Sequence, residues 1–280
     1  MFGKLGGQSL IATKLSTDLL EGIVNDLSNL KSLGHKKTSI TFAETLNGEL
    51  VKYESKDFSQ GPLKRTAEPF DVAIDGKGFF EVELPDGRRA YTRVGSFQLS
   101  SEGELITREG YRVLPEVEQD ETPKQQIKIS TNTKDENISR KSDEADLNLK
   151  ILTPKLIVPS HLTPKISEDG TILAVNSQTS NETRLGRLNI VTFNNPKGLE
   201  SIGRGFFLET NSSGTPIEIK TGIDGTSKVK QGFVEFSNVD IATSFLELSQ
   251  AKDLITAQLK ILKAIDKLYE NVNFTISRAV

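Results

Sequence analysis

The sequence predicts an α+β protein in which long terminal helices pair as a coiled-coil-like unit around an inserted all-β domain. Two apolar stripes with helical spacing, one near each end of the 280-residue chain, predict the helices. Between them, short β-branched and aromatic runs alternate with turn signals every 8–12 residues or so, which is typical of an all-β unit. The expected domains are 1–42 with 238–280 as a discontinuous helical assembly domain, 43–65 as an extended connector and 66–237 as a β domain.

The N-terminal helix is expected from apolar residues that recur every three or four positions between residues 10 and 30. Four of them follow the a/d spacing of a coiled-coil seam, namely Leu20, Ile23, Leu27 and Leu30. Gly34 can end this helix in a left-handed cap. The cations around it suit the negative end of the helix dipole. We interpret this region as a solvated helix end, and the alternative is a contact to an acidic partner surface. This basic cluster consists of Lys31, His35, Lys36 and Lys37.

The C-terminal helix is expected to begin after N-cap candidates at residues 237–240 and to run without Pro or Gly from 241 to 276. Its first apolar set repeats every seven residues at Leu248, Ile255, Leu262, Tyr269 and Ile276. A second set follows three residues later at Ala251, Ile265 and Val272, with Gln258 as a polar interruption. A stripe of this length is typical of coiled-coil packing.

The two stripes together form the predicted assembly interface. Each is longer than a compact domain needs, so each requires cover from the other stripe or from a neighbouring subunit. The predicted interface residues are Leu20, Ile23, Leu27, Leu30, Leu248, Ile255, Leu262, Ile265, Tyr269, Val272 and Ile276.

The middle zone is expected to form hairpins around the aromatic core candidates Phe79, Phe97 and Phe193. Turn signals such as Asp86-Gly87 separate the runs. The predicted strands cover residues 70–74, 79–84, 91–94, 96–99, 170–175, 187–193 and 231–236.

One internal stretch, near 116–150, differs from the rest because it is polar and charged with few aromatic residues. We expect a solvated loop, or an irregular insertion with strands around 127–129 and 147–152. No regular fold is assigned to it from the sequence.

The composition argues against catalysis and against cofactors. Zero Cys excludes disulfides, iron–sulfur clusters, thiolate zinc sites and Cys nucleophiles, and two His nearly exclude a His-based metal site. A net charge of −3 excludes the basic bias of a dedicated nucleic-acid binder, and no apolar run reaches the roughly 18–20 residues of a membrane span. We therefore predict no catalytic residue, no cofactor, no metal site, no nucleic-acid partner and no membrane insertion. The N-terminus lacks the apolar region of a secretory signal peptide, so a cleaved signal is not expected.

Three features that could suggest chemistry have structural interpretations. The Gly-x-Gly at 76–78 lacks the third glycine of a dinucleotide fingerprint and leads into a strand pattern, so we interpret it as a hairpin turn. Asp71 and Asp75 lie at a strand edge and a turn, where Asp commonly bonds its local backbone. His161 lies in a loop bounded by prolines and is interpreted as a surface side chain.

Several linked motifs occur in order along the chain. The first half carries FSQGPLKRT at 58–66, PFDVAIDGKGFF at 69–80, LPDG at 84–87, YTRVGSF at 91–97 and GEL at 103–105. The second half carries LESIGRGFFLET at 199–210 and QGFVEFSNV at 231–239. Through these motifs the chain resembles the bacterial flagellar basal-body rod and hook protein family, over nearly its whole length apart from 116–150.

The resemblance implies a structural subunit of the flagellar rod, without catalysis, that polymerises helically and transmits torque from motor to hook. It implies terminal helices lining the inner tube and β domains outside. The implied partners are further copies of the chain in a helical homo-oligomer, neighbouring rod and hook proteins, the flagellar type III export apparatus and the outer ring (bushing) proteins. The implied location is the basal body, where the rod crosses the periplasm after export without a cleaved signal peptide.

The position within the axial structure stays open from the sequence. The connector from Phe42 to Phe58 is short, which favours a proximal rod protein, whereas residues 199–210 look more like a distal one. The segments 25–30 and 258–262 depart from the family's usual terminal signatures. The alternatives are a hook-type axial protein, a non-flagellar coiled-coil and β fibre, or a cell-wall-binding protein, for which zero Trp and four Tyr are unfavourable.

Overall fold

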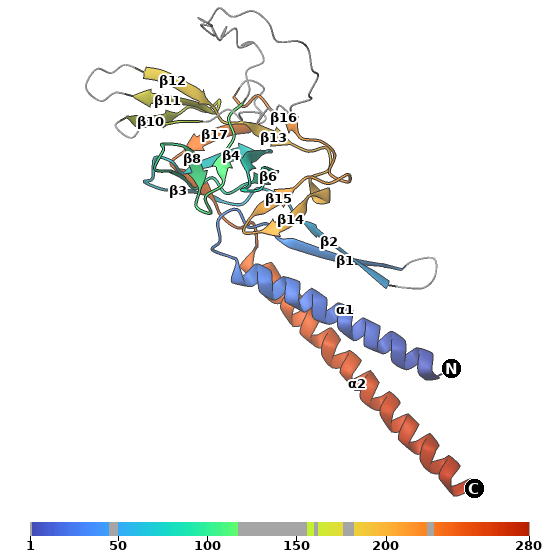
Figure 1. The fold of residues 1–280 in the computed structure, drawn as a ribbon. Helices are drawn as coiled ribbons and strands as arrows, with labels where there is room; N and C mark the ends of the chain where they lie inside the picture. The colour runs from blue at the N-terminus through green and yellow to red at the C-terminus, as the bar shows by residue number, and fades with distance from the viewer. Residues whose placement is uncertain are drawn as a thin grey trace, which may run out of the picture.

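The computed structural model describes residues 2–44, 50–116, 156–159, 162–175, 182–222 and 227–279. It confirms the α+β class, with helices α1 (Phe2–Ser28) and α2 (Ile241–Ala279) projecting from a body of β-sheets (Figure 1). The helices lie side by side and run antiparallel, so that both chain termini lie at the end of the pair remote from the β body (Figure 1). Most of the predicted polar insertion, 117–150, and His161 lie outside the described residues.

The β body contains one large antiparallel sheet and several small ones. The strands of the large sheet are β5 (Phe79–Glu83), β6 (Arg89–Thr92), β7 (Phe97–Leu99), β8 (Leu105–Thr107), β9 (Arg112–Val113), β13 (Ile190–Thr192), β14 (Glu200–Gly203), β15 (Phe206–Leu208) and β16 (Ile217–Glu218). Their order is β14-β15-β6-β5-β9-β8-β7, and β13 pairs with both β5 and β16. A 3-10 turn, η1 (Pro196–Gly198), precedes β14.

The small sheets join segments that are far apart in the sequence. Their strands are β1 (Thr38–Glu44), β2 (Leu50–Lys56), β3 (Leu63–Arg65), β4 (Val72–Gly76), β10 (Thr163–Ile166), β11 (Thr171–Val175), β12 (Glu182–Arg187), β17 (Ser227–Gln231) and β18 (Phe233–Glu235). The pairs are β1–β2, β17–β4 and β18–β3, and β10–β11–β12 form a three-stranded sheet. Strands β17 and β18, which lead into α2, therefore pair with strands from the first third of the chain.

Each of the seven predicted runs contains a strand, whereas the sequence did not predict β1, β2, β3, β8, β9, β10, β14, β15 and β16 as strands. The run expected at 187–193 divides into β12 and β13, because the Asn189 side chain bonds the buried Glu81 carboxylate and its backbone N–H bonds the carbonyl of Leu114 instead of continuing the ladder. The segment expected as a connector, 43–65, is paired: β2 forms a hairpin with β1, and β3 pairs with β18.

The two glycine turns differ in role. Asp86-Gly87 closes the β5–β6 hairpin as predicted, with the Arg88 N–H donating to Asp86 Oδ1 at 3.0 Å. The turn at 76–78 is not a hairpin, which corrects the sequence interpretation, because β4 pairs with β17 while β5 pairs with β6. This turn carries the chain from one sheet to another, and a Cβ on Gly78 would lie 2.7 Å from the Ile190 side chain.

The core lies on both faces of β5, because successive side chains of a strand point to opposite faces. Phe79 belongs to an aromatic cluster with Phe193 and Phe207, while Phe80 lies in the larger aliphatic cluster with Phe97. The ring pairs Phe79–Phe193 and Phe80–Phe97 are edge-to-face, at centroid distances of 5.9 and 5.2 Å. All three predicted core aromatics are therefore buried.

The helix ends are defined by local hydrogen bonds. Helix α2 begins where predicted, with Asp240 Oδ2 accepting from the Thr243 N–H at 2.8 Å as an N-cap. Helix α1 ends at Ser28, earlier than the stripe suggested, because the Asn29 N–H is shared between the carbonyls of Asn25 and Asp26 and the chain then tightens into a turn. Within the described residues, neither helix is both long and apolar enough to cross a membrane.

The junction between the helix pair and the β body is built on one buried carboxylate, Glu235 at the end of β18. Its Oε1 accepts from Lys36 Nζ at 2.6 Å and from the Gly61 N–H at 2.8 Å, and its Oε2 faces Arg93 at 3.5 Å. Lys36 also donates to the Ser59 carbonyl at 2.7 Å. Lys36, Arg93 and Glu235 are each at most 3% exposed, so two cations share one buried carboxylate.

Asn238 extends the junction toward α2. Its side chain accepts from the Lys37 N–H at 2.7 Å and donates to the carbonyls of Asp57 and Ser59. The Gly34 N–H donates to the Glu235 carbonyl at 2.8 Å. The segments that follow α1, follow β2 and precede α2 are therefore joined by directed hydrogen bonds.

This arrangement corrects the interpretation of the basic cluster as a solvated helix end. Lys36 is buried on Glu235, Lys37 pairs with Glu247 of α2 at 2.6 Å, and His35 bonds Asp26 at 2.9 Å, whereas Lys31 is exposed. Burial lowers the pKa of Lys36, and the Glu235 carboxylate opposes that effect. The carboxylates that neutralise the cluster lie mostly some 200 residues away in sequence, as the separation of 199 between Lys36 and Glu235 shows, so local spacing could not identify them.

Removing the shared carboxylate should destabilise the fold more than removing one of its cations. Glu235→Gln leaves two buried cations without a counter-charge, so we expect a loss of about 3–5 kcal/mol in the free energy of unfolding. Lys36→Met leaves the Arg93–Glu235 pair balanced and should cost less. Urea unfolding of both variants measures the difference, and a larger loss for Lys36→Met would contradict this assignment.

Candidate assembly interface

The two helices contact each other along one continuous seam. On both helices the seam positions follow alternating spacings of four and three residues. The α2 seam consists of Ser244, Leu248, Ala251, Ile255, Gln258, Leu262 and Ile265, and the α1 seam of Ser16, Leu20, Ile23 and Leu27. Gln258 Nε2 donates to Ser16 Oγ at 3.0 Å, which defines the register of the antiparallel pair.

The structure brings the predicted interface residues of α2 to this seam. Leu248, Ile255, Leu262 and Ile265 are half-buried there, while Tyr269 is 40% exposed. The side chains of Val272 and Ile276 lie outside the described part of the chain.

Three of the four predicted residues of α1 lie on the seam face. Ile23 is 7% exposed. Leu20 and Leu27 are half-buried and lie within about 40° of Ser16 around the helix, and Leu30 lies in the turn after the helix ends. Their role in assembly stays a prediction.

Two buried polar residues of α1 were missed by the sequence analysis. Ser16, in the seam, is 7% exposed and Asp26 is 2% exposed, and a polarity pattern would place neither of them inside. Asp26 bonds the segment after α1, where its three donors are the His35 ring Nε2 at 2.9 Å, the Thr38 N–H at 2.8 Å and the Thr38 hydroxyl at 3.1 Å. Ser16 could have been found because it continues the four-and-three spacing of Leu20, Ile23 and Leu27.

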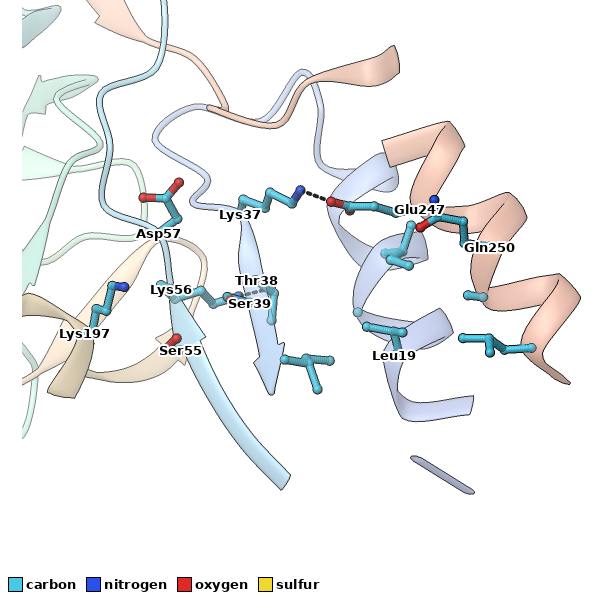
Figure 2. Close-up of a pocket in the computed structure, with 15 residues that line it drawn as sticks. Leu19, Lys37, Thr38, Ser39, Ser55, Lys56, Asp57, Lys197, Glu247 and Gln250 are labelled. Atoms are coloured by element: carbon cyan, nitrogen blue, oxygen red, sulfur yellow. Dashed lines mark hydrogen bonds and ion pairs between the residues drawn. The ribbon is translucent and has the colours of Figure 1, made fainter. Parts of the chain in front are cut away.

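A groove of about 580 Å³ lies between the helix pair and the β1–β2 hairpin, as Figure 2 shows. Its apolar wall is formed by Leu19, Ile23, Ile40, Ala251 and Leu254. Its polar wall carries Lys37, Lys56, Asp57, Lys197 and Glu247, and the Lys37–Glu247 ion pair crosses from the segment after α1 to α2 (Figure 2).

The groove has the character of a packing surface rather than of a reaction centre. Lys37 is already paired with Glu247, and Lys56 donates to the Thr38 hydroxyl at 2.6 Å. Hydrogen bonds from the Ser59 backbone, followed by its hydroxyl, hold the pKa of Asp57 below its usual value, although burial opposes them. Among the described residues, no group of three or more His, Asp or Glu side chains is arranged to hold a metal ion.

The helix pair also carries large apolar side chains that stay exposed among the described residues. On α2 these include Leu254, Ile261 and Leu268, which are 52%, 54% and 53% exposed. On α1, Val24 is 47% exposed. Exposed apolar residues that recur at helical spacing indicate a protein interface.

Comparisons with known proteins agree with this geometry. Residues 73–142 match the family model described as the flagellar hook protein FlgE/F/G D1 domain. The chain is 34% identical over 215 residues to the flagellar basal-body rod protein FlgG of Buchnera aphidicola subsp. Acyrthosiphon pisum, covering 77% of this chain and 68% of that relative. It is 31% identical over 274 residues to FlgG of Borreliella burgdorferi, covering 89% of each.

A rod protein of a second type is similar to a smaller part of this chain. FlgF of Caulobacter vibrioides is 35% identical over 108 residues, covering 34% of this chain and 44% of that relative. Fold, helix pair and sequence similarity together show that the chain belongs to the family of flagellar basal-body rod proteins of the FlgG type.

Proposed function

We propose that this chain, a structural subunit of the flagellar basal-body rod, polymerises with further copies of itself through the α1–α2 pair. In this proposal 1–42 and 238–280 form one discontinuous helical assembly domain, the helices pair in a coiled-coil-like manner, and the β body of 66–237 is inserted between them. The eleven residues predicted from the heptads then build and flank the helical seam.

The observation that carries the proposal is the placement of the helix pair. It projects from the β body instead of packing on it (Figure 1). It also exposes large apolar side chains along its length. In a single subunit these side chains face water, which costs free energy that burial in a polymer recovers. Membership of a rod protein family supports the same role.

The subunit is proposed to do no chemistry of its own and to act by transmitting torque. Neighbouring rod and hook proteins, the flagellar export apparatus and the outer ring (bushing) proteins are its proposed partners. Export without a cleaved signal peptide and a rod position crossing the periplasm belong to the same proposal. Supporting it, Lys37 and Glu247 of the groove form an ion pair, and Lys56 donates to the Thr38 hydroxyl.

The pairing of the helices can be tested by cross-linking, because the chain has no native Cys. In the double variant Ser16→Cys and Gln258→Cys, a short bifunctional thiol reagent should join the two cysteines within one chain, since Gln258 Nε2 and Ser16 Oγ lie 3.0 Å apart and the shorter Cys at 258 leaves a gap that the reagent can span. Thr17→Cys with Gln258→Cys is the matched control and should not be joined, because Thr17 is exposed on another face of α1. Mass spectrometry of dilute protein reports both results, and joining of the control alone would contradict the register.

Polymerisation should protect the helices from proteolysis. The seam of a single subunit is half-exposed and interrupted by Ser16 and Gln258, so the ends of the helices remote from the β body are weakly held without neighbours. Limited proteolysis of dilute protein should cut first in those ends, before about residue 15 and after about residue 268, and leave the rest of the helix pair joined to the β body. In polymers the same sites should become resistant, and equal cleavage in both states would contradict assembly through the helices.

A further inference from the structure

Glu81 in β5 is a buried carboxylate whose charge is poorly compensated. It is 2% exposed, and the one cation that pairs with it among the described residues is Arg89, at 3.0 Å. The Arg89 side chain is 64% exposed, so water screens its charge. Glu235, by contrast, faces two buried cations. Burying a carboxylate without such compensation costs free energy.

Both oxygens of the Glu81 carboxylate accept hydrogen bonds, but only one donor is charged. Arg89 donates to Oε1, and the side-chain amide of Asn189 donates to Oε2. An amide satisfies an oxygen acceptor without supplying a positive charge. The buried carboxylate therefore relies on one solvent-exposed guanidinium for its counter-charge.

Further carboxylates lie near the same part of the large sheet. Tyr91 is opposite Glu81 in the β5–β6 register, and its hydroxyl donates to Glu209 Oε2 at 3.2 Å. Glu218 lies on β16, which pairs with the strand β13 beside β5. Both glutamates add negative charge to the surroundings of Glu81. The charged and titratable side chains that face Glu81 or adjoin it are Glu83 of β5, Arg89 and Tyr91 of β6, Arg112 of β9, Glu209 after β15 and Glu218 of β16.

Glu81 also lies where two separate segments are attached to β5. Its carbonyl accepts from the Leu114 N–H at 3.0 Å, and its N–H donates to the Asn189 carbonyl at 3.4 Å. The Asn189 N–H in turn donates to the Leu114 carbonyl at 3.3 Å. Leu114 follows β9 and Asn189 precedes β13, so the chain that leaves the large sheet to form β10–β11–β12 is held at both ends beside Glu81.

We propose that Glu81 is a pH-sensitive attachment site, which holds the segments at Leu114 and Asn189 to β5 more firmly when its carboxyl group is protonated. Protonation removes the cost of a buried charge, and the neutral carboxyl group keeps an oxygen that accepts from Asn189. The attachment therefore strengthens in acid and weakens toward neutral pH. The inference concerns the single subunit and does not depend on polymerisation.

The direction of the pH dependence follows from the pKa of Glu81. Burial raises this pKa above its ordinary value of 4.5, Arg89 and Asn189 oppose the shift, and the charge of Glu218 adds to it. Between the ordinary value and the raised value, the folded protein binds a proton that the unfolded chain has released. The contribution of Glu81 to stability is therefore fully present below the ordinary value and is lost as the pH rises through the raised one.

Glu81→Gln tests the inference by removing the titrating group while leaving an amide oxygen that can accept from Asn189. Urea unfolding of the full chain is compared with wild type between about pH 7.5 and about pH 5. We expect the urea midpoint of wild type to rise relative to that of the variant as the pH falls. Glu102→Gln, at an exposed side chain, is the matched control and should differ from wild type by the same amount at each pH. Parallel profiles of wild type and Glu81→Gln would overturn the inference.

Two exposed neighbours give a test that does not require Glu81→Gln to fold. Arg89→Gln removes the cation that opposes the shift, so the pH dependence should move to higher pH. Glu218→Gln removes a like charge, so the pH dependence should move to lower pH. Both side chains are exposed, so the core is unchanged in each variant. Shifts in the same direction, or no shift in either variant, would contradict the assignment.

Hydrogen exchange shows where the effect is located. After correction for the intrinsic pH dependence of exchange, the Leu114 N–H should gain more protection on acidification than the Phe236 N–H, which bonds the Pro62 carbonyl at the junction. In Glu81→Gln this difference between the two amides should disappear. An equal gain at both amides in wild type would assign the pH dependence to the whole fold and contradict a local attachment site.

Discussion

The structure depends on one buried carboxylate that three separate segments share. Glu235 ends the strand that leads into α2, and it holds Lys36 from the segment after α1 and Gly61 from the segment after β2. Arg93 contributes a second cation from the large sheet and donates to the Gly76 carbonyl at 2.8 Å. A buried carboxylate is tolerated only when a cation pairs with it. Separating the segments would therefore expose the Glu235 carboxylate to water or leave it buried without a cation. The two helices consequently leave the β body side by side.

That geometry explains why helices from opposite ends of the chain can share a seam. Strands β3 and β18 pair immediately before the junction. Asn238 then hydrogen-bonds the backbone of Lys37, which follows α1, and of Ser59, which follows the β1–β2 hairpin. The seam itself is only partly apolar, because Gln258 donates a hydrogen bond to Ser16 within it. Asp26 is buried beside it. Such polar pairs specify register at some expense of stability. The β body thus brings the two helices together, and the seam aligns them in register.

Much of this fold could be predicted from the sequence, and the exceptions have physical reasons. Heptad spacing identified both helices, and turn signals located about half of the strands, because these are local properties of the chain. The buried Ser16 and Asp26 of α1 were missed, since both are polar and a polarity pattern places neither inside. The partners of the basic cluster were missed for a different reason: Lys36 finds its carboxylate 199 residues away. Buried polar pairing across that distance leaves no periodic signal.

The central claim is that the junction makes the helix pair and the β body one rigid unit, as a torque-transmitting subunit requires. Pulsed electron spin resonance between labels at Lys263 of α2 and Lys228 of β17 tests it directly, because the chain has no native Cys and both side chains are exposed. In dilute subunits the account predicts a single narrow distance distribution that does not change on polymerisation. A broad distribution that narrows only in the polymer would contradict it.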